Sequence, residues 1–147
     1  MPTSARLAGA ILMAAVGFVA AWLAKSHLPD GEPGDLLIPV GAGVGLLVGW
    51  VFTGRHLDRG AGQPAAIGIG SAALLTFWVA LVFSVEEMID RSTRNSYSGS
   101  PTRAVQDVFN IVVDYAREVL QIDVVVVLLL GGLIAASITA FVGWFFR

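Results

Sequence analysis

The chain has 147 residues, of which 56% are hydrophobic and only 14% are charged. A soluble domain averages about 45–50% apolar and about 25% charged residues, so this composition argues against an ordinary soluble enzyme. The net charge is −2 and no basic face or arm is present, which excludes a typical nucleic-acid-binding protein. The chain has no cysteine, and this excludes disulfides, a thiol nucleophile and thiolate metal ligands.

Four long stretches of the sequence contain no charged residue, and they are separated by short charged segments. Such stretches are typical of helices that cross a bilayer, because only a helix pairs all of its backbone groups within one segment. We therefore predict an all-α membrane protein that forms a single membrane domain over 1–147. The four predicted transmembrane helices cover 7–24, 37–52, 65–85 and 124–146.

The first stretch has a second interpretation. Arg6, the apolar core and the small residues Val19-Ala20-Ala21 together resemble a weak secretory signal peptide. A single arginine and a long core favour a retained span. Trp22 and Lys25 at its far end agree with this, because both residue types favour the membrane interface.

A different pattern lies between the third and fourth stretches. Pro101 can begin a helix, and apolar residues recur at the three-and-four spacing of one helix face. We predict an amphipathic helix over about 102–121, lying along the membrane or packed on the bundle. Its polar face mixes arginines with acids, which favours packing on the bundle over binding to anionic lipid. The apolar face comprises Val105, Val108, Phe109, Val112, Ala116, Val119 and Leu120.

The remaining segments, 26–36, 53–64 and 86–101, are expected to be linkers. Four spans place both ends of the chain on one side of the membrane. That side has short loops with a high density of basic residues, which predicts that both termini are cytoplasmic. The basic residues on it are Arg6, Arg55, Arg59 and Arg147.

Small residues recur every four positions in the predicted spans. Such lines let helix backbones approach closely in lipid, where apolar burial alone gains little. The favoured interpretation is packing within one chain; the alternative is a partner helix from another copy or another membrane protein. The predicted helix-packing residues are Gly41, Gly45 and Gly49 in the second span, and Gly131, Gly132, Ala135 and Ala136 in the fourth.

Glu86 and Glu87 end the third predicted span, with Arg91 following. The favoured interpretation is a solvated helix end in which Glu87 pairs with Arg91 one turn later. The alternative is a cation or proton site formed with the amphipathic helix. Hydroxyls in the spans are expected to bond across helices or back to their own backbone; they belong to Ser71, Thr76, Ser84, Ser137 and Thr139.

His27 and His56 are expected in solvated loops on opposite faces of the membrane, where they cannot share a metal ion. We find no phosphate-binding loop, serine elbow or zinc-binding helix motif. The sequence therefore predicts no catalytic residue, no cofactor and no metal site, and we do not expect an enzyme.

Several short segments, in order along nearly the whole chain, resemble the TrgA family of small bacterial membrane proteins linked to tellurium resistance. They are Met1-Pro2-Thr3, Gly45-Leu46-Leu47-Val48-Gly49-Trp50, Gly54-Arg55, Phe77-Trp78, Phe83-Ser84, Glu87-Met88, Arg91-Ser92, Tyr97, Pro101, Ala104-Val105, Phe109, Tyr115 and Gly131-Gly132.

The resemblance implies a multi-pass protein of the bacterial inner membrane that is associated with tolerance to tellurite. It supplies no catalytic residue, and the absence of cysteine argues against reduction of tellurite by a thiol of this chain. It directs attention to two groups at span ends, around Arg55 and from Glu87 to Arg91.

Three functions compete at this point. A non-catalytic accessory or scaffold component needs only lipid and helix contacts, and the sequence offers both. A small oligomeric transporter or channel for an ion or oxyanion would need polar residues in mid-membrane, where they are scarce. A membrane enzyme would need acids, bases or metal ligands that converge in a pocket.

Overall fold

The computed structural model describes residues 3–27, 36–60, 62–93, 101–119 and 121–145, and this part of the chain contains helices and no strand. The helices are α1 (Thr3–Lys25), α2 (Leu37–Val48), the π-helical turn η1 (Gly49–Thr53), α3 (Gly54–Asp58), α4 (Pro64–Thr93), α5 (Pro101–Val119) and α6 (Ile122–Phe145). The predicted all-α fold is confirmed.

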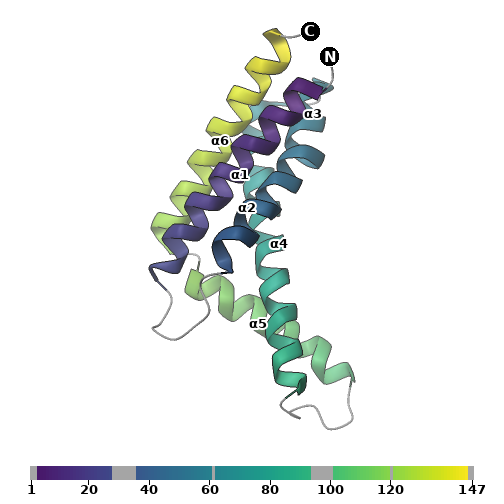
Figure 1. Ribbon diagram of the computed structural model, residues 1–147, viewed down its shortest axis with the longest axis vertical. Coiled ribbons are helices and arrows are strands. Elements are labelled where there is room, and N and C mark those ends of the chain that lie inside the picture. The colour runs from purple at the N-terminus through teal and green to yellow at the C-terminus, as the bar shows by residue number, and fades with distance from the viewer. Residues whose placement is uncertain (1–2, 28–35, 61, 94–100, 120, 146–147) are drawn as a thin grey trace.

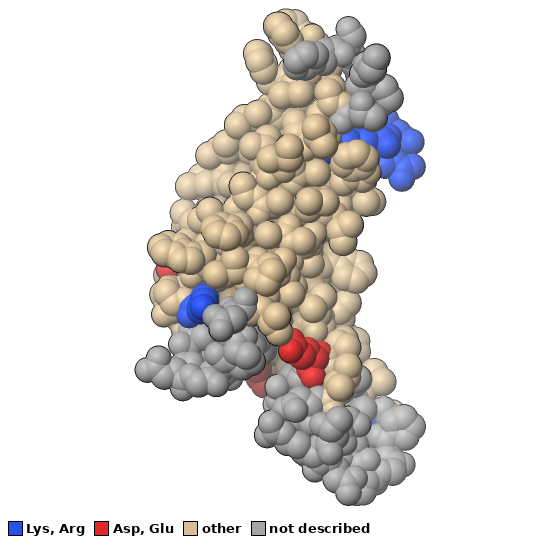
Figure 2. Space-filling model, viewed as in Figure 1, with Lys and Arg blue, Asp and Glu red and all other residues tan. Residues whose placement is uncertain are grey.

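Four helical segments are long and apolar enough to cross a membrane: Ser4–Lys25, Leu37–Asp58, Pro64–Glu86 and Ile122–Phe145. They lie side by side, with the start of α1 and the end of α6 at the same end of the bundle (Figure 1). We call this the terminal end and the opposite one the loop end. Figure 2 shows a wide band without charged residues between charges that lie toward the two ends, as expected of a bilayer-spanning bundle.

All four helices extend past the predicted spans, and two extend furthest. The second continues beyond Phe52 through η1 and α3 to Asp58, so the first part of the predicted 53–64 linker is helical. Likewise, α4 continues to Thr93, through the start of the predicted 86–101 linker. Hydropathy locates where lipid ends, whereas a helix continues into water wherever its residues allow.

Glycines bring the helix backbones into contact. A Cβ atom on Gly45 would collide with the Met13 carbonyl of α1, and one on Gly41 would lie 2.8 Å from the carbonyl of Gly17. On the other side of the bundle, a Cβ on Gly68 or Gly132 would lie 2.6 Å from the other's carbonyl oxygen. These approaches pair α1 with α2 and α4 with α6, and α1 also packs on α6. Close approach of this kind is how helices associate in lipid.

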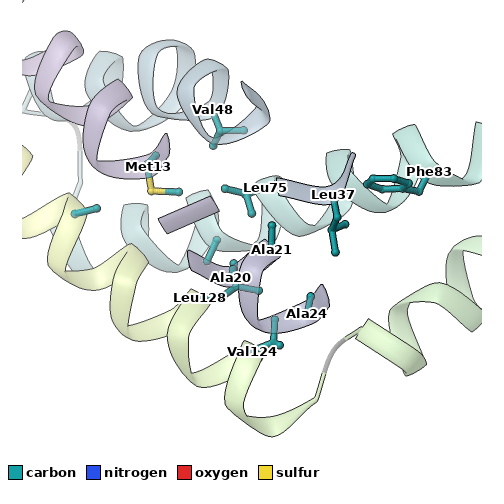
Figure 3. Close-up of a cluster of buried hydrophobic side chains, with 12 residues drawn as sticks. Met13, Ala20, Ala21, Ala24, Leu37, Val48, Leu75, Phe83, Val124 and Leu128 are labelled. Carbon is teal, nitrogen blue, oxygen red and sulfur yellow. The ribbon is translucent and has the colours of Figure 1, made fainter. Parts of the chain in front are cut away.

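The core lies between α1, α2, α4 and α6 and consists mostly of small and aliphatic side chains, as Figure 3 shows. Met13, Ala24 and Leu75 are at most 3% exposed. The outward faces of the spans instead carry large apolar residues, such as Leu47, Ile134 and Phe141. A protein surrounded by water rarely exposes so much apolar surface, whereas a bilayer solvates it.

The amphipathic helix α5 crosses the loop end of the bundle and packs on α4 (Figure 1). Ile111, which lies beside the predicted apolar face, is buried at 5% exposed. Val105 and Phe109, which belong to the predicted face, are 58% and 69% exposed. Packing on the bundle therefore uses one edge of a broad apolar face and leaves the other edge uncovered.

Candidate functional site

The polar residues proposed from the sequence do not converge. Arg55 is exposed on α3 at the terminal end, whereas Glu86 is exposed on α4 in the half that leads to the loop end. Glu87 and Arg91 belong to α4, but their side chains lie outside the described residues. The structure thus offers no contact between Arg55 and Glu86.

The residues predicted to pack helices face the inside of the bundle. Gly41, Gly45 and Gly49 of the second span meet the backbone or side chains of α1. Gly131 faces the side chain of Val16, a Cβ on it lying 2.9 Å from a Val16 methyl carbon. Gly132 meets Gly68, and Ala135 and Ala136 are at most 2% exposed. The surfaces of these small residues are therefore covered by other helices of the same chain.

A pair of hydroxyls joins two spans. Thr53 Oγ1 lies 2.6 Å from Ser71 Oγ, and both residues are completely buried. Ser71 donates its own proton to the Ile67 carbonyl at 2.7 Å, so Thr53 is the donor within the pair. The sequence had indicated Ser71 but not Thr53, because Thr53 was expected in a loop beyond the second span.

The π-helical turn η1 places Thr53 at this position. The N–H of Gly54 donates to the carbonyl of Gly49, five residues earlier, which widens the helix by one residue. One turn later, His56 Nδ1 donates to the Phe52 carbonyl at 2.8 Å, and its ring lies 4.5 Å from the Phe52 ring. His56 is therefore a half-buried residue of α3. The expectation that it lies in a solvated loop is wrong.

An ion pair lies near this turn at the terminal end. Arg6 Nε of α1 lies 3.9 Å from Asp58 Oδ2 of α3. Arg6 Nε is buried and makes no hydrogen bond in the described part of the chain, so the contact is electrostatic only. Because both side chains are partly exposed, water weakens the attraction.

A second connection between distant segments lies at the loop end. His27 Nε2, just beyond α1, donates to Asp123 Oδ2 in the first turn of α6 at 2.6 Å. His27 is exposed in a turn beyond α1, as expected from the sequence, but the sequence did not predict its contact with Asp123. Neither side chain belongs to a sequence motif, and their contact depends on how α1 and α6 are placed side by side.

An apolar pocket of about 50 Å³ lies within the loop-end half of the bundle, and we call it the loop-end pocket. Its walls come from α1, α2, α4 and α6, and Ala116 of α5 also lines it. Many lining residues are small, among them Gly17, Ala21, Gly41 and Ala80. The sequence gave no indication of this space, because it forms where residues of five helices, many of them small, face one another.

In the described part of the chain, no group of three or more histidine, cysteine, aspartate or glutamate residues is arranged to hold a metal ion. The described residues thus form an apolar pocket, and three polar contacts connect separate segments of the bundle: Thr53 with Ser71, Arg6 with Asp58, and His27 with Asp123. Comparisons of the chain with protein-family models, with curated proteins and with solved structures found no match.

Proposed function

We propose that the chain is a non-catalytic accessory or scaffold protein of the bacterial inner membrane, connected with tellurite tolerance or membrane stress. The four spanning helices make it a multi-pass membrane protein, and the tellurite connection rests on the resemblance of its sequence segments to the TrgA family. An accessory protein of this kind acts through helix and lipid contacts.

One observation favours this function over transport. The buried polar side chains among the described residues are the hydroxyls of Thr53, Ser71, Ser84 and Thr139. Ser84 donates to the Ala80 carbonyl and Thr139 to the Ala135 carbonyl, each at 2.7 Å, while Thr53 and Ser71 bond to each other. Hydroxyls that are already bonded do not make a path for a hydrated ion or oxyanion through a single copy, because a permeating ion needs polar groups to replace its water.

Growth on tellurite tests the function. In a bacterium that carries this gene, we expect deletion to lower the tellurite concentration that allows growth. The wild-type gene should restore tolerance, and so should the double variant Glu86→Gln/Glu87→Gln, because a scaffold does not need those carboxylates to exchange protons or cations. Membrane levels of each variant are measured by immunoblot.

Other results would change the conclusion. Unchanged tolerance after deletion would remove the tellurite connection. If the double variant is expressed normally but does not restore tolerance, the oligomeric transporter or channel is favoured. Flux of an oxyanion into vesicles that contain the purified protein would favour it too.

We also propose that both termini are cytoplasmic. This rests on the arginines at the terminal end and the acids near the loop end. Because the chain has no cysteine, single cysteines at Ser4 and Thr102 can be labelled with an impermeant maleimide on intact cells. We expect the cysteine at 102 to react and that at 4 to remain unlabelled until the cells are opened; the reverse pattern would invert the orientation.

A further inference from the structure

The loop-end pocket is unsuited to water. In its walls Thr76 is the polar side chain, and its hydroxyl already donates to the Ala72 carbonyl at 2.9 Å. A buried water needs about two to four polar partners, so water would lose hydrogen bonds by entering. An empty space is also unfavourable, because the wall atoms lack contacts on one side.

The position of the pocket indicates what fills it. Its walls belong to helices whose outer faces carry large apolar residues and are solvated by lipid tails. Hydrocarbon chains are therefore the most abundant apolar molecules at this depth. About 50 Å³ has room for about three to five groups the size of water. That matches the last few carbons of an acyl chain and is too little for a helix.

The helix α5 provides a second, independent observation. Ala116, which lines the pocket, lies on the same face of α5 as Phe109 and Val105, seven and eleven residues earlier. The latter two side chains are more than half exposed. Because α5 ends at Val119 and α6 begins its crossing at Ile122, this end of α5 lies at the membrane boundary. Its free apolar face is therefore placed to meet lipid tails.

We propose that the loop-end pocket is a binding site for an acyl chain of a membrane phospholipid, and that α5 lies in the interface with its free apolar face against the same lipid. The chain end contacts the small residues of α1 and α4, while Ala116 closes the pocket from the side of α5. This site requires the membrane location only and does not depend on the tellurite connection.

Native mass spectrometry of the full-length protein tests the site. The protein is taken into mild detergent from vesicles of phosphatidylethanolamine and phosphatidylglycerol, and the fraction that retains phospholipid is measured. Ala80→Phe and Ala116→Phe place a ring in the pocket, from α4 and α5 respectively. Ala73→Phe makes the same change at an exposed position of α4 and is the matched control. Val79→Ala enlarges the pocket.

We expect the wild-type protein to retain phospholipid and both filling variants to lower its affinity by about tenfold, which equals about 1.4 kcal/mol. Ala73→Phe should bind as the wild type does, and Val79→Ala at least as well. The filling variants are compared only where gel filtration and circular dichroism match the wild type. Three results would each overturn the site: a lipid-free wild type, equal binding by the filling and control variants, or a second copy of the chain retained in place of lipid.

Discussion

His27 Nε2 and Asp123 Oδ2 lie 2.6 Å apart, although the two residues are 96 positions apart in the sequence. The contact joins the segment after α1 to the first turn of α6. Ala24 and Val124, which line the loop-end pocket, lie three residues before His27 and one residue after Asp123. The pair therefore holds together two helix ends that form one wall of the pocket.

Breaking this pair should loosen the loop end slightly. We expect His27→Ala and Asp123→Ala each to lower the melting temperature in detergent, and by less than Gly45→Leu does, because exposed pairs contribute little. The double variant should melt at about the same temperature as the less stable single variant, because both substitutions remove the same contact. Simple addition of the two effects would show that the residues do not interact.

The bond between Thr53 and Ser71 should stabilise the contact between the second and third spans. Thr53→Val keeps the shape of the side chain but removes the donor, and we expect a loss of about 0.5–2 kcal/mol in the free energy of unfolding, as for other interhelical bonds in membranes. Reversible unfolding in mixed detergent micelles measures this loss.

Ser84→Ala is the control for this experiment, because its buried hydroxyl bonds back to its own helix at Ala80. Such bonds contribute little to helix stability, so this change should have a smaller effect. If Thr53→Val and Ser84→Ala lower the free energy of unfolding equally, the bond between the two spans stabilises the protein no more than a bond within one helix.

The close approach of α1 and α2 should tolerate no side chain at Gly45. A Cβ there would clash with the carbonyl oxygen of Met13, whereas a Cβ on Gly43 of the same helix would have no atom within 4 Å. We expect Gly45→Leu to destabilise the protein by about 3 kcal/mol or more, since backbone cannot move aside as a side chain can. Gly43→Leu should fold as the wild type does.

Unfolding curves and gel-filtration profiles of the two variants provide the measurement. If Gly45→Leu folds normally, the two helices do not approach as closely as described. If Gly43→Leu alone disturbs the oligomeric state, a partner helix packs on the outer face of α2.

The free apolar face of α5 should lie in lipid. Single cysteines replace Phe109 and its neighbour Asn110, both exposed, and carry nitroxide labels in phospholipid vesicles. We expect the label at 109 to collide more with oxygen, which concentrates in lipid, and the label at 110 to collide more with a water-soluble nickel complex. Equal access of the nickel complex to both labels would place α5 in water.

The sequence by itself determined how many helices cross the membrane and that α5 is amphipathic. Both follow from the solvent that each segment needs: uncharged stretches such as 7–24 require lipid, and the pattern of α5 requires a boundary between an apolar and a polar medium. The helix ends were less predictable, because residues such as Glu86 and Arg55 are compatible with helix in water.

Only the tertiary structure decided which residues meet. Gly17 with Gly41, Thr53 with Ser71, and His27 with Asp123 all depend on the rotation and relative height of neighbouring helices. Hydropathy carries no information on either quantity, since lipid solvates every apolar face alike. The loop-end pocket follows from the same geometry, because it exists only where small residues of separate helices face one another.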